Sequence, residues 1–166
     1  MRVADETASS SRTSSTYLSI ELLRNNFTGN SVADKAMIVL SDGDFSVTID
    51  SCRFHDNVAN SAGILNFYNT NLTAVIINSL FDGNYGLAGS VMSVVANAPG
   101  SRLQHAMKLD ACTFTNNAAW SGGSVLSAVV ATGTVDMGLT ISDCLFTGNS
   151  VNSTLQSLQQ SGNVFT

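Results

Sequence analysis

One short phrase recurs along the chain, a phenylalanine followed three residues later by an asparagine. The phenylalanines are Phe27, Phe54, Phe81, Phe114 and Phe146, and the asparagines are Asn30, Asn57, Asn84, Asn117 and Asn149. Successive phenylalanines are 27, 27, 33 and 32 residues apart. Repeats of roughly 20 to 50 residues are typical of solenoids and arrays. The sequence therefore predicts a stack of equivalent turns.

Positions before each phenylalanine also align. Five residues before it lie Leu22, Ile49, Ile76, Leu109 and Ile141, and two residues before it lie Asn25, Cys52, Ser79, Cys112 and Cys144. Because side chains two apart in a strand share a face, the odd step between these positions predicts a bend. Turn-forming pairs such as Asp50-Ser51 fill the step. We interpret the pattern as two short strands that meet at a corner.

A third strand is expected after each asparagine. Its inward candidates are Ile38 and Leu40, Leu65 and Phe67, Met92 and Val94, and Leu126 and Ala128, with Asn66, Ser93 and Ser127 facing outward. Small residues such as Gly122-Gly123 precede it, and glycine permits a tight turn. Together these features predict an all-β fold. We expect a right-handed parallel β-helix of about five coils with three short strands each, stacked about 4.8 Å apart.

The repeats also predict how the coils are held together. The five phenylalanines are expected to stack in one buried column, in which each fully buried ring contributes roughly 1.5–3 kcal/mol. The five asparagines are expected at a corner, because Asn tolerates left-handed backbone angles better than most residues. Their amides can hydrogen-bond from coil to coil, as in other stacked polar ladders.

Length and composition set the domain organisation. The 166 residues fit one domain, with residues 1–16 as a flexible Ser-rich leader and 17–166 as a single β-helix, interpreted as a segment of a longer chain. Near the C-terminus, a possible sixth coil is indicated by Leu158, Gln160, Asn163 and Phe165. Length variation falls in four segments, which we expect to be loops on one edge that form a contact surface. They are Ser41–Ser46, Asn69–Thr73, Ala96–Ala106 and Ala131–Gly138.

Charge and hydropathy exclude some classes of function. The net charge of −5 and the pI near 4.6 make nucleic acid an unsuitable partner. No apolar run approaches the length of about 18 residues that a membrane-spanning helix needs. The first 17 residues show no hydrophobic core of a secretory signal.

The recurring Phe-x-x-Asn, with Ala-Gly or Gly-Gly before an apolar strand, resembles the repeats of chlamydia-type polymorphic outer membrane proteins. More broadly, it is similar to the pectin-lyase-like superfamily of right-handed parallel β-helices. The similarity covers about residues 17–150. That superfamily includes polysaccharide lyases and hydrolases, adhesins and structural surface proteins, so the resemblance implies a fold and leaves several functions open.

The cysteines and carboxylates are the candidates for chemistry. Cys112 and Cys144 occupy the same place in neighbouring coils, but side chains stacked in parallel reach a disulfide dihedral with difficulty. We therefore expect buried thiols, with a disulfide as the alternative. Asp56 and Asp82 lie on adjacent coils with His55 and Arg53 nearby, and Asp42 and Asp44 form an acidic turn. Pectinolytic β-helices use clustered Asp, Arg and Lys, often with calcium, whereas we expect solvated turn residues here.

Glycans could contact or modify the chain at a few positions. Trp120 could form a platform for a sugar ring, although packing at a corner is the expected role. Candidate glycosylation acceptors are Asn26, Asn71 and Asn152, each the first residue of an Asn-x-Ser/Thr sequon.

The sequence favours a non-catalytic extracellular or cell-surface β-helix segment that acts as a rigid structural, adhesion or assembly element. No catalytic residue, metal site or cofactor is assigned. The expected partners are other subunits or flanking chain at the solenoid ends, since such ends expose unpaired backbone groups, and glycans are further candidates. The alternative is a pectin-lyase-like carbohydrate-active enzyme that acts on polysaccharide.

Overall fold

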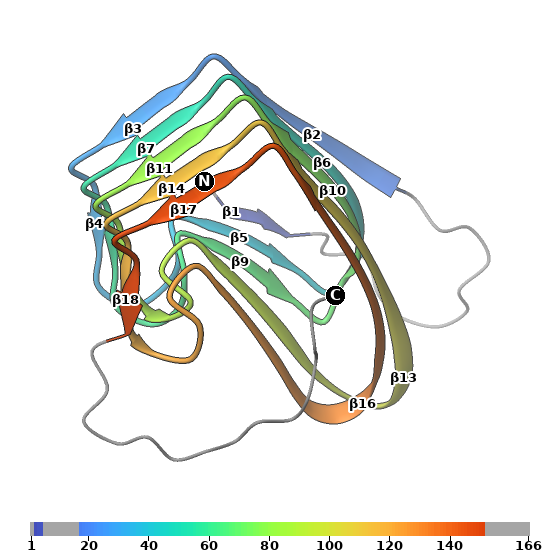
Figure 1. Cartoon of the computed structure of the whole chain (residues 1–166). Coiled ribbons are helices and arrows are strands. Elements are labelled where there is room, and N and C mark those ends of the chain that lie inside the picture. Colours follow the sequence, from blue (N-terminus) through green and yellow to red (C-terminus); the bar gives the residue numbers. More distant parts are fainter. Residues whose placement is uncertain (1, 5–16, 152–166) are drawn as a thin grey trace.

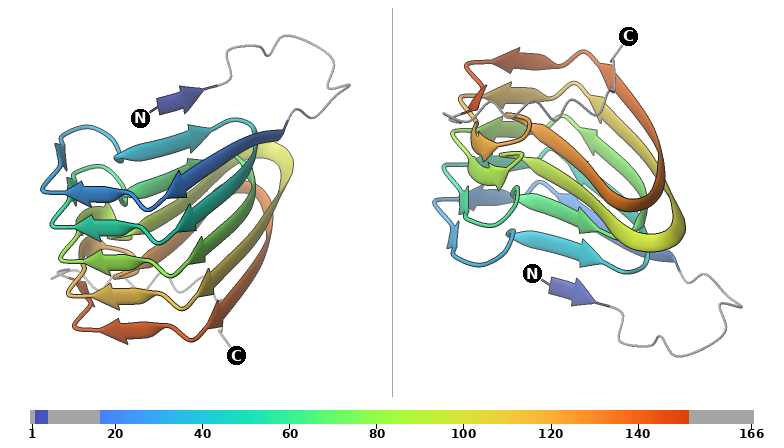
Figure 2. Two further views of the ribbon diagram at one scale, coloured as in Figure 1. Left: turned by 90° about the horizontal axis from the view of Figure 1, so that it is seen from above. Right: turned by 90° about the horizontal axis from the view of Figure 1, so that it is seen from below.

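Equivalent segments of successive repeats pair in parallel to form the molecule. The computed structural model describes residues 2–4 and 17–151, in which the chain winds through about five coils (Figure 1). All regular elements in these residues are strands. The strands of successive coils lie one above another as parallel rungs (Figure 2). The expected all-β parallel β-helix is therefore confirmed.

Three sheets run along the stack. The phenylalanine sheet contains β3 (Asn26–Thr28), β7 (Arg53–His55), β11 (Leu80–Asp82), β14 (Thr113–Thr115) and β17 (Leu145–Thr147). The small-residue sheet contains β4 (Ser31–Val32), β8 (Val58–Ala59), β12 (Tyr85–Ala88), β15 (Ala118–Ser121) and β18 (Ser150–Val151). The wide sheet contains β1 (Arg2–Ala4), β2 (Tyr17–Leu23), β5 (Ile38–Ser41), β6 (Asp44–Asp50), β9 (Leu65–Tyr68), β10 (Asn71–Ile77), β13 (Met92–Asp110) and β16 (Leu126–Ser142).

The wide sheet combines two strand positions of each coil. Two residues separate β5 from β6, and two separate β9 from β10. In the next coils the two strands join into β13 and β16, which pair along most of their length and extend beyond the shorter coils (Figure 1). The segments Ala96–Ala106 and Ala131–Gly138, expected as loops, therefore lie within strands. The extra residues of β13 and of β16 each form an arch, and the backbone groups of the two arches pair with each other.

The predicted bend lies between β6 and β7 and recurs in each coil. Ser51 there has a φ of 54°. A second left-handed residue precedes each ladder asparagine, for example Asp56 at 51° and Gly83 at 65°. The expectation that the asparagines themselves take left-handed angles is thus wrong. The preceding residue makes the reversal, which turns the asparagine side chain toward the interior of the stack.

The phenylalanines form the predicted column. Ring centroids of successive residues are 4.6, 4.8, 5.1 and 4.7 Å apart, and the ring planes are within 11° of parallel. Phe54, Phe81 and Phe114 are completely buried. Phe27 is partly buried and Phe146 is 43% exposed, because each belongs to an outermost coil of the described stack.

Two of the residues expected to face solvent are buried. Ser93 and Ser127 point away from the core, but the turn before the third strand folds over them. At Gly89, with a φ of 75°, an added Cβ would lie 2.9 Å from the Ser127 nitrogen, so only glycine fits this covering turn. Asn66 is partly buried. The prediction that these side chains point away from the core is therefore correct, but it did not include the turn that covers them.

The first strand lies in the segment expected as a flexible leader. β1 pairs in parallel with β5, with Val3 opposite Leu40. Instead of a leader without regular structure, these three residues extend the wide sheet. The remaining leader residues, and the sixth-coil pattern at Leu158, Gln160, Asn163 and Phe165, lie outside the described residues.

Candidate functional site

The five asparagines form a continuous hydrogen-bonded ladder. Asn57 Nδ2 donates to Asn84 Oδ1 at 3.0 Å, and Asn84 Nδ2 donates to Asn117 Oδ1 at 2.9 Å. Asn84 Nδ2 also donates to the carbonyl of Phe54 in the preceding coil. The predicted ladder is thus confirmed. It satisfies buried backbone groups at the corner beside the phenylalanine column.

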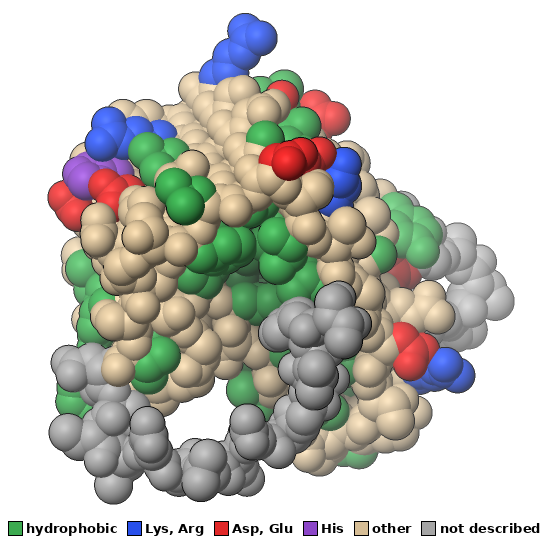
Figure 3. All heavy atoms as spheres, viewed as in Figure 1, with side chains coloured by type: hydrophobic (Ala, Val, Ile, Leu, Met, Phe, Trp, Pro, Cys, Tyr) green, Lys and Arg blue, Asp and Glu red, His purple; other side chains and the backbone are tan. Residues whose placement is uncertain are grey.

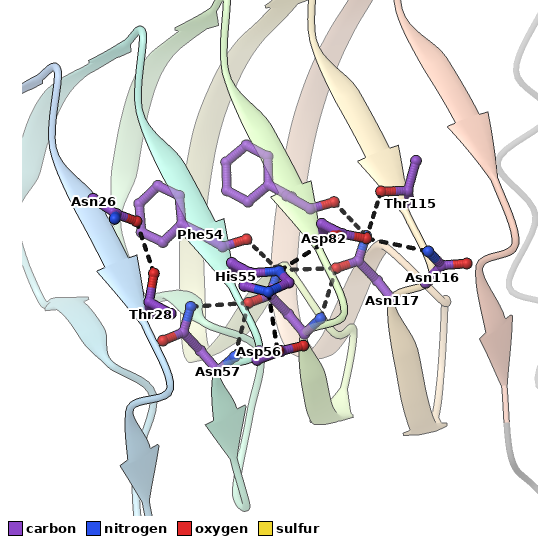
Figure 4. Close-up of polar contacts among 12 residues, drawn as sticks. Asn26, Thr28, Phe54, His55, Asp56, Asn57, Asp82, Thr115, Asn116 and Asn117 are labelled. Atoms are coloured by element: carbon purple, nitrogen blue, oxygen red, sulfur yellow. Dashed lines mark hydrogen bonds and ion pairs between the residues drawn. The ribbon is translucent and has the colours of Figure 1, made fainter.

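A polar cluster lies on the outer face of the phenylalanine sheet (Figure 4). His55 Nε2 lies 3.0 Å from Asp56 Oδ2, and Nδ1 lies 3.2 Å from Asp82 Oδ2 without the alignment of a hydrogen bond. Asp82 accepts hydrogen bonds from Thr115 Oγ1 at 2.7 Å and from Asn116 Nδ2 at 3.2 Å. The Thr115 hydrogen bond holds the pKa of Asp82 below its ordinary value. The cluster therefore links three coils on the surface.

The geometry of this cluster favours cross-linking of coils over metal binding. The two carboxylates lie at opposite nitrogens of one imidazole ring, so their donors do not converge on a common centre. Within the part of the chain that the structure describes, no group of three His, Cys, Asp or Glu side chains is arranged to hold a metal ion. Arg53 is exposed on the same strand as His55. The Asp42–Asp44 pair instead hydrogen-bonds Asn69 and Asn71 of the next coil.

The cysteines form a second polar ladder. All three are free thiols, as expected, and Cys52 and Cys112 are buried. Cys112 Sγ lies within hydrogen-bond distance of the Asp110 carbonyl at 3.2 Å, and the Cys112 amide lies 3.4 Å from Cys144 Sγ. Ser79 takes the equivalent place with its hydroxyl. Burial raises the pKa of the Cys112 thiol. Both residue types at this position are small and can donate and accept a hydrogen bond. The sequence analysis expected buried thiols and did not predict these hydrogen bonds.

Trp120 and the sequon asparagines differ in accessibility. The Trp120 side chain is 52% exposed, so the expected packing at a corner is wrong. It lies on β15 near the exposed Leu87 of the adjacent β12, on the outer face of the small-residue sheet. Asn26 is exposed and accepts a hydrogen bond from Thr28. Asn71 is partly buried and its Nδ2 donates to Asp44 at 2.6 Å, which a glycan would replace. Asn152 lies outside the described residues.

The interior of the wide sheet contains a histidine that the sequence analysis missed. His105 is only 3% exposed and neighbours Leu72 and Met137 in the sheet register. Burial lowers its pKa, while the Thr70 backbone acts in the opposite direction without completing a hydrogen bond to either ring nitrogen. The alternation Leu103, His105, Met107 was the available signal, because it places the imidazole on the inward face.

The two ends of the described stack are apolar and hollowed. The C-terminal end face is defined by Leu109, Leu126, Leu139, Ile141 and Phe146, which line a hollow of about 470 Å³. Hydrophobic side chains gather at the centre of this face (Figure 3). The N-terminal end face is defined by Ile20, Leu22, Phe27, Val32 and Ile38, which line a hollow of about 350 Å³. Exposed apolar patches of this kind mark interaction surfaces.

Comparisons with known proteins add no family to this description. No protein-family model matches the sequence, and no curated protein is found to be similar to it. Among the described residues there is no helix long and apolar enough to cross a membrane. The chain is therefore classified by its structure, as a parallel β-solenoid.

Proposed function

We propose that the chain is a non-catalytic, extracellular or cell-surface β-helix segment that acts as a rigid structural, adhesion or assembly element. The observation that carries this proposal is the uninterrupted phenylalanine column with its parallel asparagine ladder. Both join every pair of neighbouring coils in the described stack. Such a stack resists bending because each coil is bonded to the next by backbone and side chain alike.

The apolar end faces support the assembly role. Each places core side chains where another coil or subunit could cover them. The resemblance of the Phe-x-x-Asn repeats to those of polymorphic outer membrane proteins agrees with a surface location and with adhesion. The exposed Trp120 offers a flat apolar contact for a glycan or a protein.

Two measurements test the proposed function. Protease added to intact source cells is expected to remove the chain from their surface, and residues 17–151 are expected to persist as one resistant fragment. Purified protein is expected to release no new reducing ends from acidic polysaccharides. Release that is lost in Asp82→Asn would instead support the carbohydrate-active alternative. Protection of the chain in intact cells, with cleavage only after lysis, would contradict the surface location.

A further inference from the structure

The two end faces present the same ladder positions. Among the described residues, Phe27 and Phe146 are the outermost rings of one column, and Leu22 and Ile141 each lie five residues before these rings. Ile141 and Phe146 are 46% and 43% exposed. Inside the stack, each of these two positions lies next to the equivalent position of the neighbouring coil. Ile49, for example, pairs in register with Ile76. The N-terminal face therefore presents to the C-terminal face the same ladder positions that a further coil would present.

The asparagine ladder adds a direction. At each internal junction, the asparagine of the earlier coil donates from Nδ2 and from its backbone nitrogen to Oδ1 of the next asparagine. In the described part of the chain, the Asn149 backbone N–H and the Asn30 Oδ1 have no partner. One end thus offers the donor and the other offers the acceptor of the same ladder bond.

The sheet edges are complementary in the same way. Among the described strands, β16, β17 and β18 end the three sheets on the C-terminal side, and β2, β3 and β4 each have an unpaired edge on the N-terminal side. Unpaired edges of this kind readily accept a further strand. A strand from another coil could continue the parallel register at each of them.

We propose that the C-terminal end face of one copy binds the N-terminal end face of a second copy, so that solenoids join head to tail. In this junction Phe146 stacks on Phe27 of the next copy, and Asn149 donates to Asn30. Because the two surfaces differ, the contact is heterologous and leaves a free end for further growth. The inference rests on the proposed function as an assembly element and specifies its partner.

β1 takes part in complete docking. It pairs with the edge of β5 that faces away from β9, so it lies at the third-strand position of a coil before the first one. The last described coil, which contains β17 and β18, has no described third strand at this position. In the head-to-tail junction, β1 would therefore lie between its own β5 and the first half of β16 of the other copy. A Val3→Pro variant removes a backbone donor from this strand and is expected to weaken association by disturbing this pairing.

Sedimentation velocity of the full chain, from micromolar to millimolar concentrations, tests the proposal. The wild-type chain is expected to form species larger than dimers as its concentration rises. Leu22→Asp disables the N-terminal face, and Ile141→Asp disables the C-terminal face. Each change would bury a carboxylate against apolar side chains, so each variant alone is expected to associate at least about a hundredfold more weakly. The control Leu87→Asp, on the side of the stack, is expected to associate like wild type.

Mixing the two disabled variants gives the decisive result. Leu22→Asp keeps a working C-terminal face and Ile141→Asp keeps a working N-terminal face, so the mixture is expected to form dimers that do not extend. Association of either variant alone at wild-type strength would overturn the head-to-tail contact. Should an aspartate variant lose its circular dichroism signal, Asn30→Leu removes the ladder acceptor at an exposed position and is expected to weaken association about tenfold.

A monomeric wild-type chain at every concentration would overturn the inference, because it would show that the end faces do not bind a second copy. That result leaves the proposed function standing, since surface exposure and protease resistance are measured independently of association.

Discussion

At the scale of single residues, the phenylalanine column shows how one repeated side chain fixes a stack. Parallel rings 4.6 to 5.1 Å apart fill the interior on the inner face of the phenylalanine sheet. The asparagine three residues later satisfies the buried backbone that the turn would otherwise leave without partners. Each repeat therefore contributes both a stacked ring to the core and an asparagine that hydrogen-bonds the buried backbone beside it.

The column makes a direct prediction for stability. Phe81→Ala removes a completely buried ring between two others and is expected to lower the free energy of unfolding by about 3–5 kcal/mol. Phe146→Ala is the matched control. It is expected to cost clearly less, because that ring is 43% exposed. Urea denaturation followed by circular dichroism measures both, and equal losses would contradict the buried column.

His105 predicts a dependence of stability on pH. Its folded-state pKa lies below the ordinary value of 6.5, so the unfolded chain binds more protons below that pH. The free energy of unfolding is therefore expected to be unaffected above about pH 6.5 and to fall as the pH decreases, by at most about 1.4 kcal/mol per pH unit. The loss should end at the folded-state pKa.

Two variants separate this effect from other titrations. His105→Met is expected to remove the slope, since Met137 already fills the equivalent inward place in the next coil. His55→Gln removes the other histidine of the sequence and should leave the slope in place. Urea denaturation at a series of pH values measures both, and a slope that survives in His105→Met would rule out the buried imidazole as its source.

At the scale of elements, register decides which residues form the core. β13 places Met107 opposite Ala74 in the core. The coil that contains the arch of β13 is six residues longer than the preceding coil. The arch pairs with β16, where Arg102 forms an exposed ion pair with Asp136. Exposed pairs of this kind contribute little to stability.

Deletion of residues 97–102 is expected to preserve the fold. It shortens the coil to 27 residues, like the two before it, and should change the free energy of unfolding by less than about 2 kcal/mol. Deletion of residues 103–108 is the control. It also removes six residues, but these include the buried Leu103, His105 and Met107, so it should lower the free energy of unfolding by more than about 3 kcal/mol. Circular dichroism distinguishes the two, and equal behaviour would contradict the register.

At the scale of the whole molecule, the chain behaves as a line of units that contact only their neighbours. The stability of such an array is approximately the sum of the units and their junctions. Every internal junction here repeats the same column contact and the same ladder bonds. Removal of one unit should therefore leave the others able to stack.

Deletion of residues 54–80 removes one period of 27 residues and brings Phe81 into the place of Phe54. We expect a folded protein whose free energy of unfolding is lower by about 1–4 kcal/mol, from roughly 0.05–0.15 kcal/mol per residue. Deletion of 54–79 breaks the register by one residue and should abolish folding. Cooperative thermal unfolding of the first variant, and none of the second, is the expected result.

The sequence by itself determined the coil, the column and the ladder. These features recur in all five repeats, so the equivalent positions of the phenylalanines and asparagines can be recognised by aligning the repeats. The strand parity around them also follows from local geometry. Stacking of the five rings and hydrogen bonding of the five amides could therefore be predicted without any knowledge of distant contacts.

The tertiary structure decided what lies over and between the repeats. Ser93 and Ser127 are buried because the turn before the third strand folds over the outer face of that strand. The small residues of this turn recur in the sequence, but they do not show which face of the strand the turn covers. The arches of β13 and β16 became strands because each found the other as a partner. The polar cluster brings His55 and Thr115 to one carboxylate from coils on either side of Asp82. These outcomes depend on contacts between different segments, which no local sequence pattern specifies. A repeated residue, in contrast, contacts its own equivalent in the next coil, so the repeat itself predicts the contact.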